Sequence, residues 1–330
     1  MSNTPKFNRR QAMAGVAGAA SLMVSPSWAQ TYPSKQITLI VSYPAGGDTD
    51  ALGRVLAEKL SARMGQTVVV DNKPGASGTI GNAMVAKAAP DGHTLLMTPS
   101  TIATALLVLK PGSGGSYDTV GDFAPVFLMG TQSLFLVVNT STGINNMTEF
   151  VAAAKSGKID TYASPGSGSP MHLLGEMFNK SAGVKLRQVP YRGSAPAVND
   201  MLGGHINFMY TTLGPINAHI QSGKMRVLAV ADAKRSTLAP TVPTLQESGL
   251  KDSDIGAWQA VLAPKGTPEA IIRTLNGHLN DIIKMPDVLA RMNTAFTVPV
   301  GGEPQLAMRS LAGDNEKYGK VIKEFGIQAD

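Results

Sequence analysis

The sequence has 330 residues, with 29 Lys or Arg against 23 Asp or Glu, and it contains no cysteine. The lack of cysteine excludes metal sites built on thiolates and thiol nucleophiles. No basic cluster with interleaved aromatic residues follows residue 29, so the sequence predicts no nucleic-acid partner. The length suits one large or two medium domains.

The first 29 residues resemble a secretory signal peptide. Lys6, Arg9 and Arg10 form a positive start, and residues 12–24 are apolar but too short for a stable membrane anchor. Ser27-Trp28-Ala29 fits a small-x-small cleavage site. Removing this segment leaves 26 basic and 23 acidic residues. We therefore expect an exported, soluble protein; the twin arginines leave the export route open.

After the signal peptide, short β-branched or apolar runs alternate with amphipathic patterns. This alternation predicts an α/β fold with mainly parallel sheets flanked by helices. The expected strands cover residues 37–41, 67–70, 94–97, 134–138, 162–164, 206–210, 227–230 and 258–263. Asp48 is a candidate cap for a helix that ends at Gly65, and Pro268, Pro286 and Pro304 each mark the start of a later helix. Residues 110–116 are glycine-rich and predict a surface loop.

Four segments place small residues directly before a helix: residues 42–50, 75–81, 164–172 and 191–194. The first N–H groups of a helix lack internal partners and carry partial positive charge, so such starts suit anions. Glycine also allows close approach of a ligand to the backbone. Ser169, before Pro170, is the clearest helix start. Taken singly, each segment is equally well explained as an ordinary connection between a strand and a helix.

Motifs for enzymatic chemistry are lacking in the sequence. Gly166-Ser167-Gly168 has no third glycine at the offset of a dinucleotide fingerprint, and Gly75-Ala76-Ser77-Gly78-Thr79 fails as a nucleophile elbow. The five histidines form no pair at helical metal-binding spacing. We therefore expect no catalytic residues, no metal and no cofactor.

Several single residues allow two interpretations. His172 could donate to a ligand or only order its loop, and Asp50 could order the Gly46-Gly47 loop or only complement the helix dipole. Arg192 could pair with a ligand carboxylate or remain a solvated charge. The sequence leaves these alternatives open.

The motifs, taken in order, resemble those of the Bug family, the substrate-binding components of tripartite tricarboxylate transporters. They are Tyr43-Pro44-Ala45-Gly46-Gly47 with Asp50, Asn72-Lys73-Pro74-Gly75-Ala76-Ser77-Gly78, Ala89-Pro90-Asp91-Gly92, Asp122-Phe123-Ala124-Pro125-Val126, Ala163-Ser164-Pro165-Gly166-Ser167-Gly168-Ser169 with His172, Val189-Pro190-Tyr191-Arg192-Gly193-Ser194, and Leu202-Gly203-Gly204. The resemblance extends over essentially all of the chain after the signal peptide.

The resemblance implies a periplasmic binding protein of the type II, flytrap-like class. Its two α/β domains would close on a small carboxylate, such as a di- or tricarboxylate or a related organic acid, and the protein, expected as a monomer, would deliver it to membrane transporter subunits. The chain would cross between domains near Gly130 and Ala231. Domain 1 would then comprise residues 30–130 and 232–330, and domain 2 residues 131–231.

The resemblance also nominates ligand-binding residues on loops of both domains. They are Gly46, Gly47, Asp50, Ser100, Thr101, Ser164, Gly168, Ser169, His172, Tyr191 and Thr211. One departure concerns Thr211 and Thr212, which stand where many relatives carry Asp or Asn. Without an acid there, the sequence favours a carboxylate ligand that has no ammonium group.

Two other functions are compatible with this scaffold. A receptor for a membrane sensor protein would use the same binding chemistry, so the sequence does not separate it from a transporter receptor. A hydrolase would need a nucleophile paired with a base, and the sequence offers none.

Overall fold

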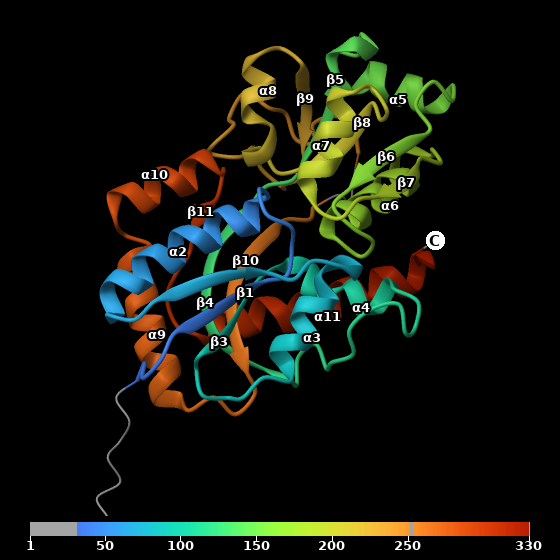
Figure 1. Ribbon diagram of the computed structural model, residues 1–330. Helices are drawn as coiled ribbons and strands as arrows, with labels where there is room; N and C mark the ends of the chain where they lie inside the picture. The colour runs from blue at the N-terminus through green and yellow to red at the C-terminus, as the bar shows by residue number, and fades with distance from the viewer. Residues whose placement is uncertain (1–31, 251–253, 330) are drawn as a thin grey trace, which may run out of the picture. The chain divides into compact units, whose positions relative to one another are not determined.

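The computed structural model describes residues 32–250 and 254–329. The expected signal peptide, residues 1–29, lies outside the described residues. Within the described part, the strands form two sheets, each flanked by helices (Figure 1). This arrangement confirms the expected α/β fold.

The first sheet has six strands in the order β11-β4-β10-β3-β1-β2. The strands are β1 (Ile37–Val41), β2 (Val68–Asn72), β3 (Thr94–Pro99), β4 (Phe123–Gln132), β10 (Ala257–Pro264) and β11 (Val298–Pro299). The second sheet has five strands in the order β7-β6-β8-β5-β9. They are β5 (Phe135–Asn139), β6 (Thr161–Ser164), β7 (Arg187–Pro190), β8 (Phe208–Thr211) and β9 (Met225–Val230).

Both sheets are mixed, but most strands of each run in one direction, as expected: β1–β4 in the first sheet and β6–β9 in the second. β1 pairs in parallel with β2 and β3, and β6 pairs in parallel with β7 and β8. β10, however, is antiparallel to β3 and β4, and β5 is antiparallel to β8 and β9. The chain leaves the first sheet through β4 and returns through β10, and neighbouring strands that carry a chain out and back must run in opposite directions.

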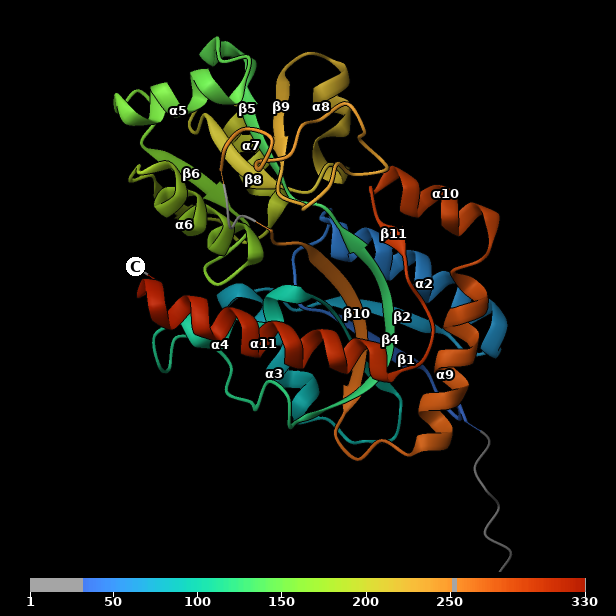
Figure 2. The same cartoon turned by 180° about the vertical axis from the view of Figure 1, so that it is seen from behind.

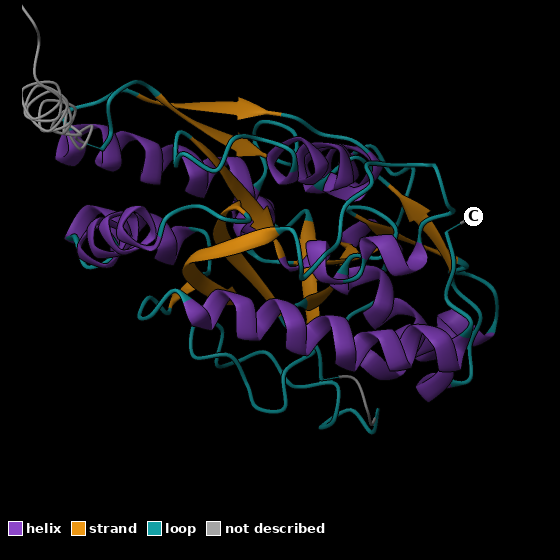
Figure 3. Cartoon of the chain, turned by 90° about the horizontal axis from the view of Figure 1, so that it is seen from below, coloured by secondary structure: helices purple, strands orange, loops and turns teal. Residues whose placement is uncertain are grey.

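Helices cover both faces of the first sheet, and Figure 3 shows its strands between them. On one face lie α2 (Asp48–Met64), α9 (Glu269–Ile282) and α10 (Pro286–Thr294), which pack on one another and on β2 and β4. On the other lie α3 (Thr79–Ala86) and α11 (Gln305–Phe325), whose Val85 and Leu311 join a buried cluster with Leu96 and Leu262. α4 (Ala105–Val108) precedes β4.

The second sheet is covered in the same way. α5 (Met147–Lys155) and α6 (Pro170–Ala182) bury an aromatic cluster against it, in which the rings of Phe150 and Phe208 lie 4.5 Å apart. α7 (Ser194–Leu202) packs on the opposite face, and α8 (Asn217–Gln221) precedes β9. The last turns of α11 also reach this sheet, because Tyr318 and Ile322 belong to the same cluster as Phe208 (Figure 2).

The expected helix boundaries agree closely with the structure. α2 ends at Gly65, which takes the left-handed conformation at φ 65°, as a helix-terminating glycine does. Pro268 and Pro304 occupy the N-cap positions of α9 and α11, and Pro286 is the first residue of α10. Asp48, expected as a cap, is the first residue of α2, and Gly47 is the N-cap.

Candidate functional site

One cavity lies where the carboxyl ends of parallel strands from both sheets face each other. Ligands in open α/β sheets bind at this end because the strand-to-helix loops gather there. About 570 Å³ of space in and at the mouth of the cavity, including open solvent, is free of protein atoms. It is lined by Tyr43, Pro44, Gly47, Asp48, Thr49, Pro99, Ser100, Thr101, Gln132, Pro165, Pro170, Met171, Arg192, Gly193, Ser194, Ala195, Pro196, Thr212, Ala257 and Gln259.

The start of α7 lines this cavity with free helix-terminal amides. Gly193 is the N-cap, with φ 103°, and it makes no side-chain cap hydrogen bond. Helix geometry leaves the N–H groups of Ser194 and Ala195 without intrahelical acceptors, and Pro196 has no N–H. The exposed side chain of Arg192 lies directly before this helix start. The helix dipole and the guanidinium therefore both place positive charge at the cavity wall.

The start of α2 lines the cavity with a carboxyl group. The Thr212 hydroxyl donates to Asp48 Oδ2, and Gln132 Nε2 donates to the same oxygen at 3.3 Å. These bonds join α2 to the residue that follows β8 of the second sheet and to the end of β4. Burial raises the pKa of Asp48 to about 6, and the bonds from Thr212 and Gln132 oppose that rise. This wall is therefore acidic where the α7 wall is basic.

Two glutamines continue the polar network from Asp48. Gln259 Nε2 donates to Gln132 Oε1 at 3.2 Å, and the Thr49 hydroxyl donates to Gln259 Oε1 at 3.2 Å. Gln132 and Gln259 are both buried, at 3% relative exposure, and stand on the two strands that connect the sheets. The network fixes these side chains because a buried polar group without a partner is costly.

Loops from the two sheets also touch each other around the cavity, and glycines make these contacts possible. A Cβ atom at any of these glycines would lie 2.8–3.2 Å from an atom of the facing loop. The pairs are Gly166 with Ser77, Gly168 with Ala105, Gly193 with Pro44, and Gly214 with Asp48 and Ala295. The Thr104 hydroxyl also donates to the carbonyl of Gly168. The glycine-rich loops therefore let the two halves of the protein meet.

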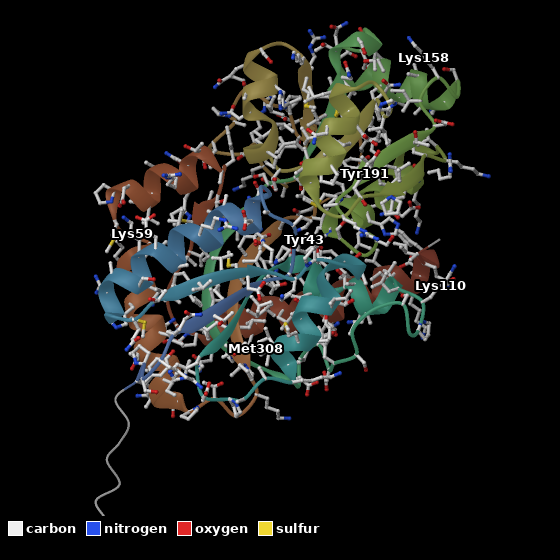
Figure 4. The ribbon with its side chains drawn as sticks, viewed as in Figure 1. Tyr43, Lys59, Lys110, Lys158, Tyr191 and Met308 are labelled. Carbon is white, nitrogen blue, oxygen red and sulfur yellow. The ribbon has the colours of Figure 1, made fainter. Side chains whose placement is uncertain are left out.

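Three of the residues expected at a ligand site line the cavity: Gly47, Ser100 and Thr101. Tyr43, which the motif analysis also singled out, lines it too, and Figure 4 marks Tyr43 and Tyr191 on the loops of the two halves. Burial raises the pKa of Tyr43 well above its usual range, and its hydroxyl donates to the carbonyl of Ser77.

The other expected residues at the start of α6 lie behind the cavity wall. Ser169 Oγ caps the helix by accepting from the His172 N–H at 3.2 Å, and His172 Nδ1 accepts from the Gly168 N–H at 3.1 Å. Ser164 Oγ accepts from Gln188 Nε2 at 2.6 Å. These bonds order the loop, and a ligand role for Ser164, Gly168, Ser169 and His172 stays a prediction.

Asp50 is also engaged within the protein. It accepts from the Gly46 N–H at 2.9 Å, from Asn72 Nδ2 at 2.9 Å and from Arg54 Nε at 3.1 Å. Burial would raise its pKa, but the bonds from Arg54, Gly46 and Asn72 outweigh burial and lower it. Asp50 thus orders the Gly46 loop, one of the two interpretations that the sequence left open; ligand contacts by Gly46 and Asp50 stay predictions.

Tyr191 and Thr211 lie beside the lining residues. The Tyr191 hydroxyl donates to Asp200 at 2.8 Å, and burial together with that carboxylate raises the Tyr191 pKa to about 12. Thr211 is buried, and its hydroxyl has no partner among the residues that the structure describes. The next residue, Thr212, faces the cavity instead. A ligand role for Tyr191 and Thr211 stays a prediction.

Sequence reasoning missed the acidic wall, formed by Asp48, Gln132, Gln259 and Thr212. Asp48 was interpreted only as a helix cap. A signal for the glutamines existed, because Gln259 interrupts an otherwise apolar strand between Trp258 and Ala260. A buried polar residue in such a strand needs partners and often marks a site.

The described residues include no group of three or more His, Cys, Asp or Glu side chains arranged to hold a metal ion. Among the helices described, none combines the length and apolar character needed to cross a membrane.

Comparison with known proteins agrees with the fold. The family described as "Tripartite tricarboxylate transporter family receptor" matches residues 52–327. The chain belongs to this receptor family. Protein BugT of Bordetella pertussis is 36% identical to it over 325 residues, which cover 98% of this chain and 99% of BugT. The Bug-family resemblance is therefore confirmed.

Solved structures of receptor-family proteins share the architecture. The periplasmic binding protein BugD superimposes with a TM-score of 0.84 at 32% identity, covering 91% of this chain and 100% of BugD. Rpa4515 of R. palustris, solved with adipate, gives a TM-score of 0.84 at 31% identity, covering 90% and 99%. These likenesses confirm the two-domain α/β fold of a periplasmic binding protein, and they make this chain a homologue of solute-binding receptors.

Proposed function

We propose that this protein captures a small carboxylate in the cavity between the two sheets and delivers it to the membrane subunits of a tripartite tricarboxylate transporter. Binding involves no covalent chemistry. The ligand class comprises di- and tricarboxylates and related organic acids.

The observation that carries this proposal is the start of α7. Its first amides have no intrahelical acceptors, its N-cap Gly193 supplies no capping side chain, and Arg192 stands beside it. A carboxylate is the ligand that satisfies such amides, because it accepts hydrogen bonds and complements the positive end of the helix dipole. The capped start of α6 is less suited, since Ser169 already occupies its His172 amide.

The relatives support the ligand class. Rpa4515, at 31% identity, was solved with adipate, which has two carboxylates. The family's own description as a receptor of tripartite tricarboxylate transporters supports the partner.

Capture proceeds by closure of two domains, residues 30–130 with 232–330 and residues 131–231. The division is supported by the strands, because β1–β4, β10 and β11 build one sheet and β5–β9 the other. The glycine contacts support closure, since they form only when both halves meet. A ligand that touches both halves favours the closed state over the open one.

The proposal places the protein in the periplasm after export directed by residues 1–29, as a monomer that requires no cofactor. The periplasmic homologue BugD supports the location.

Calorimetric titration of residues 30–330 with a panel of small carboxylates tests the proposal. At least one acid should bind with a dissociation constant below about 100 μM, and the same acid should raise the thermal midpoint, as binding to the folded state alone requires. The proposal fails if no acid in the panel binds, or if the protein turns one over.

A variant at α7 locates the binding site. Ser194→Asp places a carboxylate at the helix start, which favours the helix but competes with the ligand for the same amides. We expect unchanged or higher stability together with at least tenfold weaker binding. Gln305→Glu adds the same charge at the start of α11, away from the cavity, and should leave affinity unchanged. Equal affinity in the two variants would exclude the α7 site.

A further inference from the structure

The carboxyl group of Asp48 has one oxygen that the protein leaves unused. Oδ2 accepts from Thr212 and Gln132, whereas Oδ1 accepts no hydrogen bond from any residue in the described part of the chain. Oδ1 lies against Gly214, which has no polar side chain to offer. Because Asp48 lines the cavity, water or a ligand can supply the donor that Oδ1 lacks.

The neighbours of Asp48 cannot turn to receive an anion there. Gln132 Nε2 donates both to Asp48 and to the Ala295 carbonyl at 3.3 Å, so its two N–H groups are occupied. The hydroxyls of Thr212 and Thr49 donate to Asp48 and Gln259. Apart from the second N–H of Gln259, for which the described residues offer no acceptor, this wall presents acceptors and negative charge to the cavity. A ligand carboxylate placed at Asp48 would meet that negative charge.

Charge divides the cavity between its two walls. Asp48 is the one acidic and Arg192 the one basic side chain among the lining residues of the described structure. A bound acid can place its carboxylate at Arg192 and the start of α7. The other end of that ligand then faces Asp48. A ligand that carries a hydrogen-bond donor there can pair with Oδ1, whereas a ligand without one leaves Oδ1 unpaired.

We propose that Asp48 is a specificity-determining residue, which makes the cavity prefer carboxylates carrying a hydroxyl or ammonium donor over their unsubstituted counterparts. This inference rests on the proposed function and deepens it. The sequence favoured a ligand without an ammonium group, because Thr211 and Thr212 stand where relatives carry an acid or amide. The inference reverses that expectation, because Asp48, on α2 beside the first sheet, supplies an acid next to Thr212.

The test is calorimetry at pH 8, where Asp48 is ionised, with matched acids of increasing length. Each set contains an unsubstituted acid and its 2-hydroxy and 2-amino derivatives: propionate with lactate and alanine, succinate with malate and aspartate, glutarate with 2-hydroxyglutarate and glutamate, and adipate with its derivatives. A hydrogen bond to a charged group corresponds to roughly a tenfold to hundredfold difference in affinity. We expect the tightest-binding set to show such a preference for a donor-bearing member.

The variant Asp48→Asn assigns the preference to this residue. It keeps the shape of the side chain and should reduce the preference to about threefold or less, mainly by binding the unsubstituted acid more tightly, since the repulsion is removed. Glu269→Gln removes one charge from the first turn of α9, outside the cavity, and should retain the preference.

The outcomes separate this inference from the proposed function. The inference is overturned if the unsubstituted acid binds as tightly as its derivatives, or if Asp48→Asn keeps the same preference. Either result leaves the proposed receptor function intact. Failure of every acid in all sets to bind overturns both.

Discussion

Gly214 provides a way to perturb the contact between the two halves from a position that borders Asp48 but lies outside the cavity lining. It does not line the cavity, yet a Cβ added there would lie 2.8 Å from Asp48 Oδ1 and 3.0 Å from the Ala295 carbonyl oxygen. Its φ lies outside the left-handed region, so Gly214→Ala introduces a clash without backbone strain. Overpacking of this kind costs about 1–3 kcal/mol.

The protein can relieve this clash by moving the two halves apart. If ligand binding requires the two halves to be in contact, the energy of the clash makes binding less favourable by the same amount. The dissociation constant of Gly214→Ala should then rise by roughly fivefold to 150-fold. Calorimetric titration with the tightest-binding carboxylate measures this change, and circular dichroism with thermal unfolding confirms that the variant is folded.

Two glycines provide matched controls. A Cβ at Gly277, inside α9, meets nothing within 4 Å, so Gly277→Ala should bind normally and gain slight stability. Gly223 has φ 70° and equally open surroundings, so Gly223→Ala should lose stability through strain and still bind normally. Wild-type affinity in Gly214→Ala would refute the reasoning that contact between the halves accompanies binding.

Three further substitutions have expected effects on stability. Because burial raises the Asp48 pKa from 3.8 to about 6, the folded protein holds a proton that the unfolded chain releases, so its stability falls as pH rises through this window. In urea unfolding, the free energy of unfolding of Asp48→Asn should therefore exceed that of the wild type by up to about 3 kcal/mol at pH 7.5, and the two values should converge near pH 4. A difference in unfolding free energy that stays constant with pH would contradict this. Ser169→Ala removes the cap of α6 and should cost about 1 kcal/mol in the same assay, whereas no loss would show that the cap is unimportant. Gly175→Ala would place a Cβ 2.2 Å from the Tyr162 ring and should lower the thermal midpoint by several degrees; an unchanged midpoint would mean that α6 shifts freely.

Local signals in the sequence predicted most of the helices and strands. α2 follows from an acidic first turn, apolar residues at helical spacing and a terminating Gly65, all of which act within a few residues. The antiparallel pairing of β4 with β10 could not be predicted in this way. It joins Phe127 to Val261, and such a pairing depends on the path of the whole chain through the second sheet.

The candidate site was predicted in part, and for a related reason. The family resemblance nominated Gly47, Ser100 and Thr101 as ligand-site residues, and all three line the cavity. Glycine patterns alone could not show that Gly166 and Gly168 contact the facing loops, because that contact exists only when the two sheets are brought together. The same holds for Asp48, whose partner Thr212 is 164 residues away in the sequence.

The central claim is that a carboxylate binds at the start of α7, and a crystal structure with the tightest-binding acid tests it most directly. The account predicts a ligand carboxylate within hydrogen-bonding distance of the Ser194 and Ala195 amides, with Arg192 beside it. A carboxylate bound elsewhere, with the start of α7 left to solvent, would contradict it.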